Sequence, residues 1–239
     1  MTHPHIITIE GGNKLLASLS PLDEWHTIEM SLSRIRLTAG ATIFDGEMDR
    51  VLFIESGLIL PMVITGTGES LGVAIIGSEG AVGLFEDGDG EYSFQFRAMT
   101  DVEALQINAR TLSLACSRNE QLETLLRTYS QRLMKNAILV MACHYHHGLE
   151  KRLPRWLLTT AARIGSNTLF TTQNVLADAH GVTISAISHT LEDLQRKGLI
   201  QHERGQITLL NHKGLRSLAC QCCPTTGQGK KYVIRTHSL

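Results

Sequence analysis

The sequence predicts an α+β protein built from an N-terminal β-barrel or jelly roll, one long helix and a C-terminal winged helix-turn-helix. Three observations predict it. Short apolar segments separated by glycines fill the chain up to about residue 108, a helical pattern without Gly or Pro covers 119–148, and helix, tight turn, helix and hairpin follow one another at 170–210. We place the parts at 1–118, 119–148 and 149–223, followed by a tail at 224–239.

The N-terminal part shows the alternating apolar pattern of strands with regularly spaced turns. An antiparallel barrel or jelly roll explains this spacing, because closure removes exposed strand edges. Two small helices, at 13–19 and 21–30, are expected to cover one end. The expected strands are 32–37, 41–44, 51–55, 57–64, 70–76, 92–98 and 102–107.

The long helix carries an apolar stripe at three- and four-residue spacing. About 30 residues at roughly 1.5 Å per residue give about 45 Å, more than a compact domain usually needs. We therefore expect self-pairing with a second copy, while packing on the barrel alone remains the alternative. The residues expected at the dimer seam, among them an asparagine that could fix the register, are Leu122, Leu126, Tyr129, Leu133, Asn136 and Val140.

A break at Gly148 separates this helix from the next one, expected at 149–164. Pro154 lies in the first turn of the second helix, where its missing N–H does little harm. Gly148 is the expected hinge between the N-terminal part and the C-terminal domain.

The C-terminal domain begins its helix-turn-helix at Thr171 or Thr172, whose hydroxyls can cap a helix. Gly181 ends that helix, Thr183 caps the next one, and Gly198 stops it. The segments 199–200 and 207–209 then flank a turn and form a hairpin "wing". This order of elements is how a protein places one helix in a groove of DNA.

The distribution of charge agrees with a nucleic-acid partner. Residues 1–149 carry 10 Lys and Arg against 18 Asp and Glu, whereas residues 150–239 carry 12 against 5. Only the C-terminal part therefore has the sign that phosphates attract. The chain has no apolar run of about 18 residues and no signal-peptide core, so we expect a cytoplasmic protein without a membrane partner.

Five cysteines without a secretory signal argue against structural disulfides. The cluster Cys220, Cys222 and Cys223 has no second cysteine pair at zinc-site spacing. In the run 143–147, consecutive positions point about 100° apart and cannot converge on one ion, although Cys143 and His147 could supply two ligands and a dimer two more. We expect ordinary thiols and no metal site. A redox- or metal-responsive sensor or scaffold with weak or non-specific DNA binding, acting through Cys116, Cys143 or the C-terminal cluster, remains the alternative. No catalytic triad order, phosphate loop or dinucleotide turn appears, so the chain is not expected to be an enzyme.

At this point the chain resembles the bacterial Crp/Fnr-type transcription regulators, from about residue 19 to 222. The resemblance is strongest at 150–158 (EKRLPRWLL), 175–181 (VLADAHG) and 191–200 (LEDLQRKGLI), with similar barrel turns at 54–57 (IESG) and 77–83 (GSEGAVG). It implies a cyclic-nucleotide-binding-type barrel and a homodimer joined through the long helices. It also implies a roughly palindromic operator in double-stranded DNA, with the second helix of the motif in the major groove. RNA polymerase is a further candidate partner.

The resemblance fails at the nucleotide pocket. Family members that bind cyclic nucleotides use a Glu and an Arg-Ser or Arg-Thr pair, where this chain has Ala81 and Tyr92-Ser93. Without that Arg, a buried phosphate lacks its bidentate partner, so cyclic AMP is not expected to bind. An iron–sulfur cluster of the family's N-terminal type is not expected either, because no Cys precedes Cys116; haem stays open. The candidate effector-pocket residues are Gly80, Ala81, Tyr92 and Ser93.

The recognition helix also departs from the family, which usually places Arg-Glu or a similar pair and a later Arg there. His189 falls where a guanine-reading Arg is expected, so we expect a different operator. Hydroxyls can contact phosphates or bases, and an Ala can meet a thymine methyl group. The candidate DNA-reading residues are Thr183, Ser185, Ala186, Ser188 and His189, and the candidate phosphate contacts are Arg204, Gln206, Thr171 and Thr172.

Overall fold

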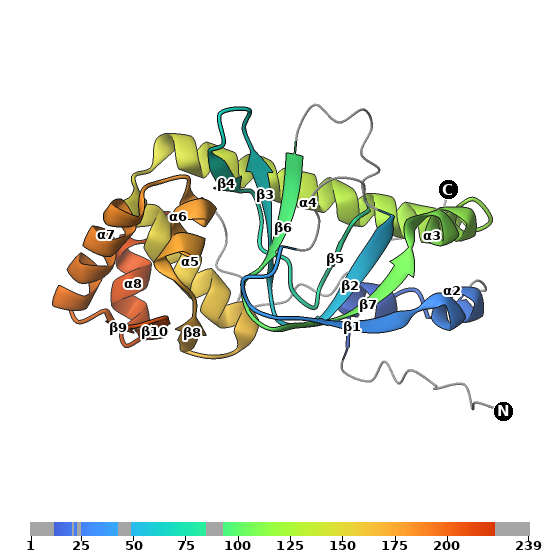
Figure 1. The fold of residues 1–239 in the computed structure, drawn as a ribbon, viewed down its shortest axis with the longest axis horizontal. Coiled ribbons are helices and arrows are strands. Elements are labelled where there is room, and N and C mark those ends of the chain that lie inside the picture. The colour runs from blue at the N-terminus through green and yellow to red at the C-terminus, as the bar shows by residue number, and fades with distance from the viewer. Residues whose placement is uncertain (1–11, 21, 23–24, 43–48, 85–92, 223–239) are drawn as a thin grey trace.

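The computed structural model describes residues 12–20, 22, 25–42, 49–84 and 93–222. A β-rich domain, one long helix and a C-terminal domain follow one another along the chain, as the sequence predicts (Figure 1). The long helix α4 (Glu120–His146) runs behind the β-rich domain and reaches the C-terminal domain at its far end. No helix in the described part of the chain is long and apolar enough to cross a bilayer.

The β-rich domain consists of two antiparallel sheets, with strand orders β1-β7-β2-β5 and β4-β3-β6. The expected strand at 41–44 is reduced to one bridge between Thr42 and Arg97 within the described residues. The expected strand at 70–76 is interrupted, because its register against β3 shifts by one residue between Gly72 and Ile76. The strands are β1 (Ser33–Leu37), β2 (Arg50–Ser56), β3 (Ile59–Ile64), β4 (Ser70–Gly72), β5 (Ala81–Val82), β6 (Ser93–Ala98) and β7 (Val102–Asn108).

Short helices accompany these sheets: α1 (Lys14–Ala17), α2 (Trp25–Ser31) and α3 (Ala109–Cys116). Helix α3 is not among the elements predicted from the sequence. Its signal is local, since the Asn108 side chain accepts hydrogen bonds from the N–H groups of Arg110 and Thr111, and Leu112 and Ala115 lie buried at helical spacing.

Helix α4 begins with a cap, in which the Asn119 side chain accepts from the N–H of Leu122 at 3.0 Å. It ends at His146, and α5 (Leu149–Ile164) starts after two extended residues, His147 and Gly148. The break at Gly148 is therefore where the sequence predicts it. The φ of Gly148 is −67°, which any residue can adopt, so the break does not require glycine.

The first half of the apolar stripe predicted for self-pairing faces the chain's own β-rich domain. Leu122, Leu126 and Tyr129 are buried in one core cluster with residues of β2 and β7, so they are not available to a partner. Asn136 lies further along the same helix and is exposed. From Leu122 to Tyr129 the stripe therefore packs on the barrel, which is the alternative interpretation.

A different apolar face of α4 is exposed. Its large side chains are Met134, Ile138, Met141 and Tyr145, with exposed fractions of 55, 51, 46 and 85%. Their spacing of four, three and four residues is the spacing of a coiled-coil seam. At about 100° per residue, Ile138 lies about 160° around the helix from Asn136, on the side away from the predicted stripe.

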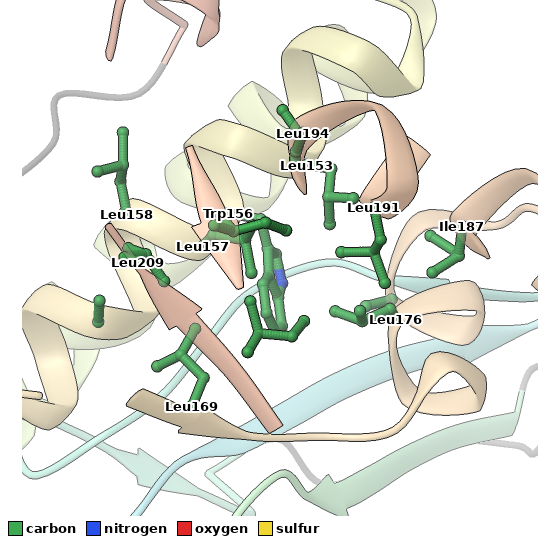
Figure 2. Packing of buried hydrophobic residues seen from close by; sticks show 14 of the residues in the cluster. Leu153, Trp156, Leu157, Leu158, Leu169, Leu176, Ile187, Leu191, Leu194 and Leu209 are labelled. Carbon is green, nitrogen blue, oxygen red and sulfur yellow. The ribbon is translucent and has the colours of Figure 1, made fainter. Parts of the chain in front are cut away.

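The C-terminal domain packs helices and a three-stranded sheet, order β8-β10-β9, around a leucine-rich core. Figure 2 shows Trp156 of α5 in the middle of this core, among leucines of α5, α6, α7 and the sheet. Strand β8 and helix α8 were not predicted. The elements are β8 (Thr168–Phe170), α6 (Gln173–His180), α7 (Ile184–Arg196), β9 (Ile200–Glu203), β10 (Gln206–Leu209) and α8 (His212–Leu218).

Candidate nucleic-acid interface

Helix α7 has one buried and one exposed face. Ile187, Leu191 and Leu194 anchor it in the core, so the register of the helix is fixed and its remaining positions point outward. Thr183 caps it by accepting a hydrogen bond from the N–H of Ala186 at 3.3 Å. The first turn therefore presents a defined set of polar groups next to the positive end of the helix dipole.

The predicted DNA-reading residues lie on this outward side. Thr183, Ser185 and His189 are exposed, whereas Ala186 and Ser188 are half-buried. The Ser188 hydroxyl donates to Oε1 of Glu192 at 3.3 Å, so it is already engaged within the helix. His189 is the longest of the set, and 74% of its side chain is exposed.

Acidic residues on α7 have partners of their own. Oδ1 of Asp193 lies 2.8 Å from Nη2 of Arg196, and Oδ2 lies 3.7 Å from Nε2 of His189. This neighbour can hold the imidazole of His189 by one nitrogen and leave the other directed away. Arg196, which is not among the predicted DNA contacts, is a long exposed cation at the C-terminal end of α7.

The wing and the cap of α6 supply the expected phosphate contacts unequally. Arg204 is exposed in the turn between β9 and β10, where Gly205 takes the left-handed φ of +72°. Gln206 is half-buried, and its side-chain amide donates to Thr208 at 3.4 Å. Thr172 is exposed and caps α6 through the N–H of Val175. The hydroxyl of Thr171 is buried without a hydrogen-bond partner among the described residues. The predicted phosphate contact of Thr171 is therefore not supported, because this hydroxyl does not face outward.

The backbone at two of the effector-pocket candidates is occupied by the protein itself. The Tyr129 hydroxyl accepts from the N–H of Ala81 at 2.9 Å and donates to its carbonyl at 3.0 Å. The carbonyl of Gly80 accepts from the side-chain amide of Asn13 at 2.6 Å. Ser93 begins β6 opposite Ile64, and Tyr92 lies outside the described residues.

The C-terminal domain is docked on the β-rich domain by polar contacts. Asp178 of α6 pairs with Arg97 of β6 and accepts from the hydroxyl of Ser70 at 3.1 Å. Arg163 at the end of α5 pairs with Glu79 at 2.9 Å. These pairs join residues far apart in the chain, so no local sequence pattern could reveal them.

Backbones also approach closely at this interface. A Cβ on Gly72 of β4 would lie 3.0 Å from the carbonyl oxygen of Ala179 in α6. The two domains share one apolar cluster, in which Leu60 and Met62 join the leucines of the C-terminal core. The first helix of the motif, α6, therefore packs on the β-rich domain, while α7 lies on the side of the C-terminal domain that faces away from the β-rich domain (Figure 1).

A basic cluster is buried beneath α6. His180 is 2% exposed, and its ring meets that of Trp156 edge-on, with 6.0 Å between centroids. Burial and the nearby Arg152 hold the pKa of His180 well below its usual range. Burial, with a contribution from Arg152, also lowers the pKa of His144 to about 4. Both imidazoles are neutral in the folded protein at neutral pH.

The C-terminal domain matches a known domain family, and the fold matches known structures. The family model of the Crp-like helix-turn-helix domain matches residues 151–218. A comparison with curated proteins gives no match.

Three similar solved structures cover most of the chain. A protein of the Crp/Fnr regulator family from Eubacterium rectale is 19% identical with a TM-score of 0.70, covering 82% of this chain and 94% of that one. FixK2 from Bradyrhizobium japonicum is 17% identical with a TM-score of 0.66, covering 79% and 98%. The Crp-family transcriptional regulator TTHB099 from Thermus thermophilus is 20% identical with a TM-score of 0.64, covering 77% and 95%.

These likenesses confirm the predicted α+β fold of an N-terminal sheet domain, long helix and helix-turn-helix. They also agree with the expectation that the chain is not an enzyme, since the matching domain and structures belong to transcription regulators. The chain thus carries a Crp-like helix-turn-helix DNA-binding domain at residues 151–218 and has the fold of the Crp/Fnr transcription regulators.

Proposed function

We propose that this protein is a sequence-specific transcription regulator that binds a roughly palindromic operator as a homodimer. The observation that carries the proposal is the outward face of α7, where Thr183, Ser185 and His189 are exposed on a helix anchored by a packed core. A helix held in this way can enter the major groove with its N-terminal residues toward the bases. The exposed Arg204 of the wing fits a phosphate contact beside that groove.

The exposed face of α4 supports the homodimer. Met134, Ile138, Met141 and Tyr145 follow one heptad seam along the half of α4 that leaves the β-rich core. A second copy of the same seam would cover all four side chains at once, as two-fold symmetry requires. The two recognition helices would then be related by that axis, which is what a palindromic operator needs.

The N-terminal domain is proposed to have lost cyclic AMP binding. Ala81 replaces the family's acidic residue, and its backbone N–H and carbonyl are both bonded to Tyr129. A nucleotide phosphate would have to displace this buried pair of hydrogen bonds without an arginine at Tyr92 to compensate. A calorimetric titration should therefore give no cyclic AMP binding at micromolar concentrations, and tight binding would contradict the proposal.

Regulation is proposed to act through the position of the C-terminal domain relative to α4. The contacts of Asp178 with Arg97 and Ser70 hold α6 on the β-rich domain, and Gly148 marks the break between α4 and α5. A signal that breaks the contacts of Asp178, or changes the chain direction at Gly148, would move α7 between two arrangements.

Fluorescence anisotropy with DNA tests the proposed function directly. Labelled genomic fragments are titrated over a series of salt concentrations, with unrelated DNA of equal length as competitor. A sequence-specific regulator should bind some fragments at salt concentrations that release the competitor. Contacts to the bases add affinity to that of the salt-sensitive phosphate contacts. Equal loss of all fragments with salt would favour the alternative of non-specific binding.

A further inference from the structure

Four metal-ligating side chains from two distant segments meet beside the hinge. Cys143 and His147 come from the C-terminal end of α4, and Cys220 and Cys222 follow α8. Sγ of Cys143 lies 3.2 Å from Sγ of Cys220, and Sγ of Cys222 lies 3.3 Å from Nδ1 of His147. All four ligand atoms lie within 4.8 Å of one another, and Cys143 and Cys220 are buried.

These separations suit a single ion. With metal bonds of about 2.3 Å to sulfur and about 2.0 Å to nitrogen, three sulfurs and one nitrogen around a tetrahedral ion lie roughly 3.5 to 3.8 Å apart. A cluster of several irons would spread the ligands further, because each iron takes its own. Three soft thiolates and one imidazole are the ligands of a structural zinc site.

The charges around the cluster point the same way. Arg152 and Arg155 are 7% and 5% exposed, and within the described residues neither has a carboxylate at ion-pair distance. Both act electrostatically on the neighbouring cysteine thiols. Zn²⁺ with three thiolates and a neutral imidazole carries one net negative charge, which gives these buried cations a counterion.

We propose that Cys143, His147, Cys220 and Cys222 bind one Zn²⁺ ion per chain and so clamp the end of α4 to the end of the C-terminal domain. Zn²⁺ replaces the three thiol protons, which pass to solvent. Two ligands lie on each side of Gly148, so the ion closes a loop that contains the whole helix-turn-helix. The sequence predicts ordinary thiols here, because Cys143 and Cys220 are 77 residues apart and only folding joins them. This site is independent of the proposed operator binding.

Zinc content of the full-length protein tests the site. The protein is purified under reducing conditions, stripped with a chelator and titrated with Zn²⁺ against a chromophoric competitor. We expect one Zn²⁺ per chain, and with Co²⁺ the thiolate charge-transfer and visible bands of a tetrahedral site. Because loss of even a supporting contact costs about 10- to 100-fold in affinity, Cys143→Ser and Cys222→Ser should each weaken binding by at least about 100-fold.

The matched control is Cys116→Ser, a half-buried thiol at the end of α3 that lies outside the cluster. It should keep one Zn²⁺ per chain. His147→Ala removes a half-buried ligand and replaces Cys143→Ser as the test variant if that variant does not fold. Circular dichroism checks the folding of each variant. The proposal is overturned if the reduced wild-type protein binds no Zn²⁺, if it holds iron with acid-labile sulfide, or if Cys116→Ser abolishes binding while Cys143→Ser does not.

Discussion

The hydroxyl of Tyr129 joins the long helix to the β-rich domain by bonding both the backbone N–H and the carbonyl of Ala81. Sequence pattern placed Tyr129 on an apolar stripe but could not say which surface the stripe meets, because a barrel and a second helix present the same periodicity. The same limit applies to Asp178 and Arg97, whose pairing depends on the docking of two domains.

The first residue-scale prediction concerns this hydroxyl. Tyr129→Phe leaves the N–H and carbonyl of Ala81 buried without a partner, so the free energy of unfolding should fall by about 1–3 kcal/mol. Chemical denaturation measures it. Thr38→Val removes an exposed hydroxyl of the β-rich domain and should change stability little. Equal effects of the two substitutions would contradict the role given to Tyr129.

The second prediction is a pH dependence of stability. The pKa of His180 is lowered in the folded protein from its ordinary value of 6.5, so below about pH 6.5 the unfolded chain takes up a proton that the folded chain does not. Stability is therefore fully present above pH 6.5 and falls as the pH drops. Melting temperatures between pH 5 and 7.5 should decrease toward acid, and less steeply in His180→Gln, which is neutral throughout. Parallel curves for the two proteins would contradict this account.

At the scale of elements, sequence predicted the helix-turn-helix well because its signals are local. Thr172, Gly181 and Thr183 occupy the cap positions expected of them. Strand β8 was missed because three residues carry too little pattern, and it forms only when β10 pairs with it. The apolar positions at helical spacing predict which face of α7 is buried, and therefore which residues lie on its outward face.

The wing provides an element-scale prediction. Arg204→Ala should weaken binding to all DNA sequences by a similar factor. The slope of log affinity against log salt should fall by about 0.9 per subunit, or about 1.8 for the proposed dimer, since each wing loses one phosphate contact. Anisotropy at several salt concentrations measures the slope. Arg110→Ala, an exposed arginine after β7, is the control. A change of sequence preference without a change of slope would contradict a phosphate role for Arg204.

The docking of α6 on the β-rich domain gives a second element-scale prediction. Arg97→Ala removes the partner of Asp178, and loss of about 1 kcal/mol from a partly exposed pair should speed proteolytic cleavage near Gly148 about fivefold. Arg36→Ala breaks a pair with Glu103 inside the β-rich domain and should not change cleavage. If both variants are cut at the wild-type rate, the contact does not hold the domains together.

At the scale of the whole molecule, sequence predicted the order of the parts but not their contacts. The predicted dimer seam is the clearest case, because residues expected there, such as Leu122, are buried internally while Met134 and Ile138 are exposed. Which apolar face meets its own domain depends on where the sheets lie, and periodicity does not contain that information.

The exposed seam predicts the oligomeric state. Ile138→Asp places a charge on the proposed seam and should convert the dimer to a monomer in sedimentation analysis, because a buried charge without a partner opposes association. Asn136→Asp places the same charge on the opposite side of α4 and should leave the dimer intact. The reverse result would restore the seam expected from sequence.

Selection of binding sites from random DNA by the purified protein tests the central claim most directly. The account predicts an enriched sequence with two-fold symmetry whose half-sites lie about one helical turn, roughly 34 Å, apart. His189→Ala should relax the preference within each half-site while keeping the symmetry. Recovery of DNA without any common sequence, or of single unpaired sites, would contradict a dimeric sequence-specific regulator.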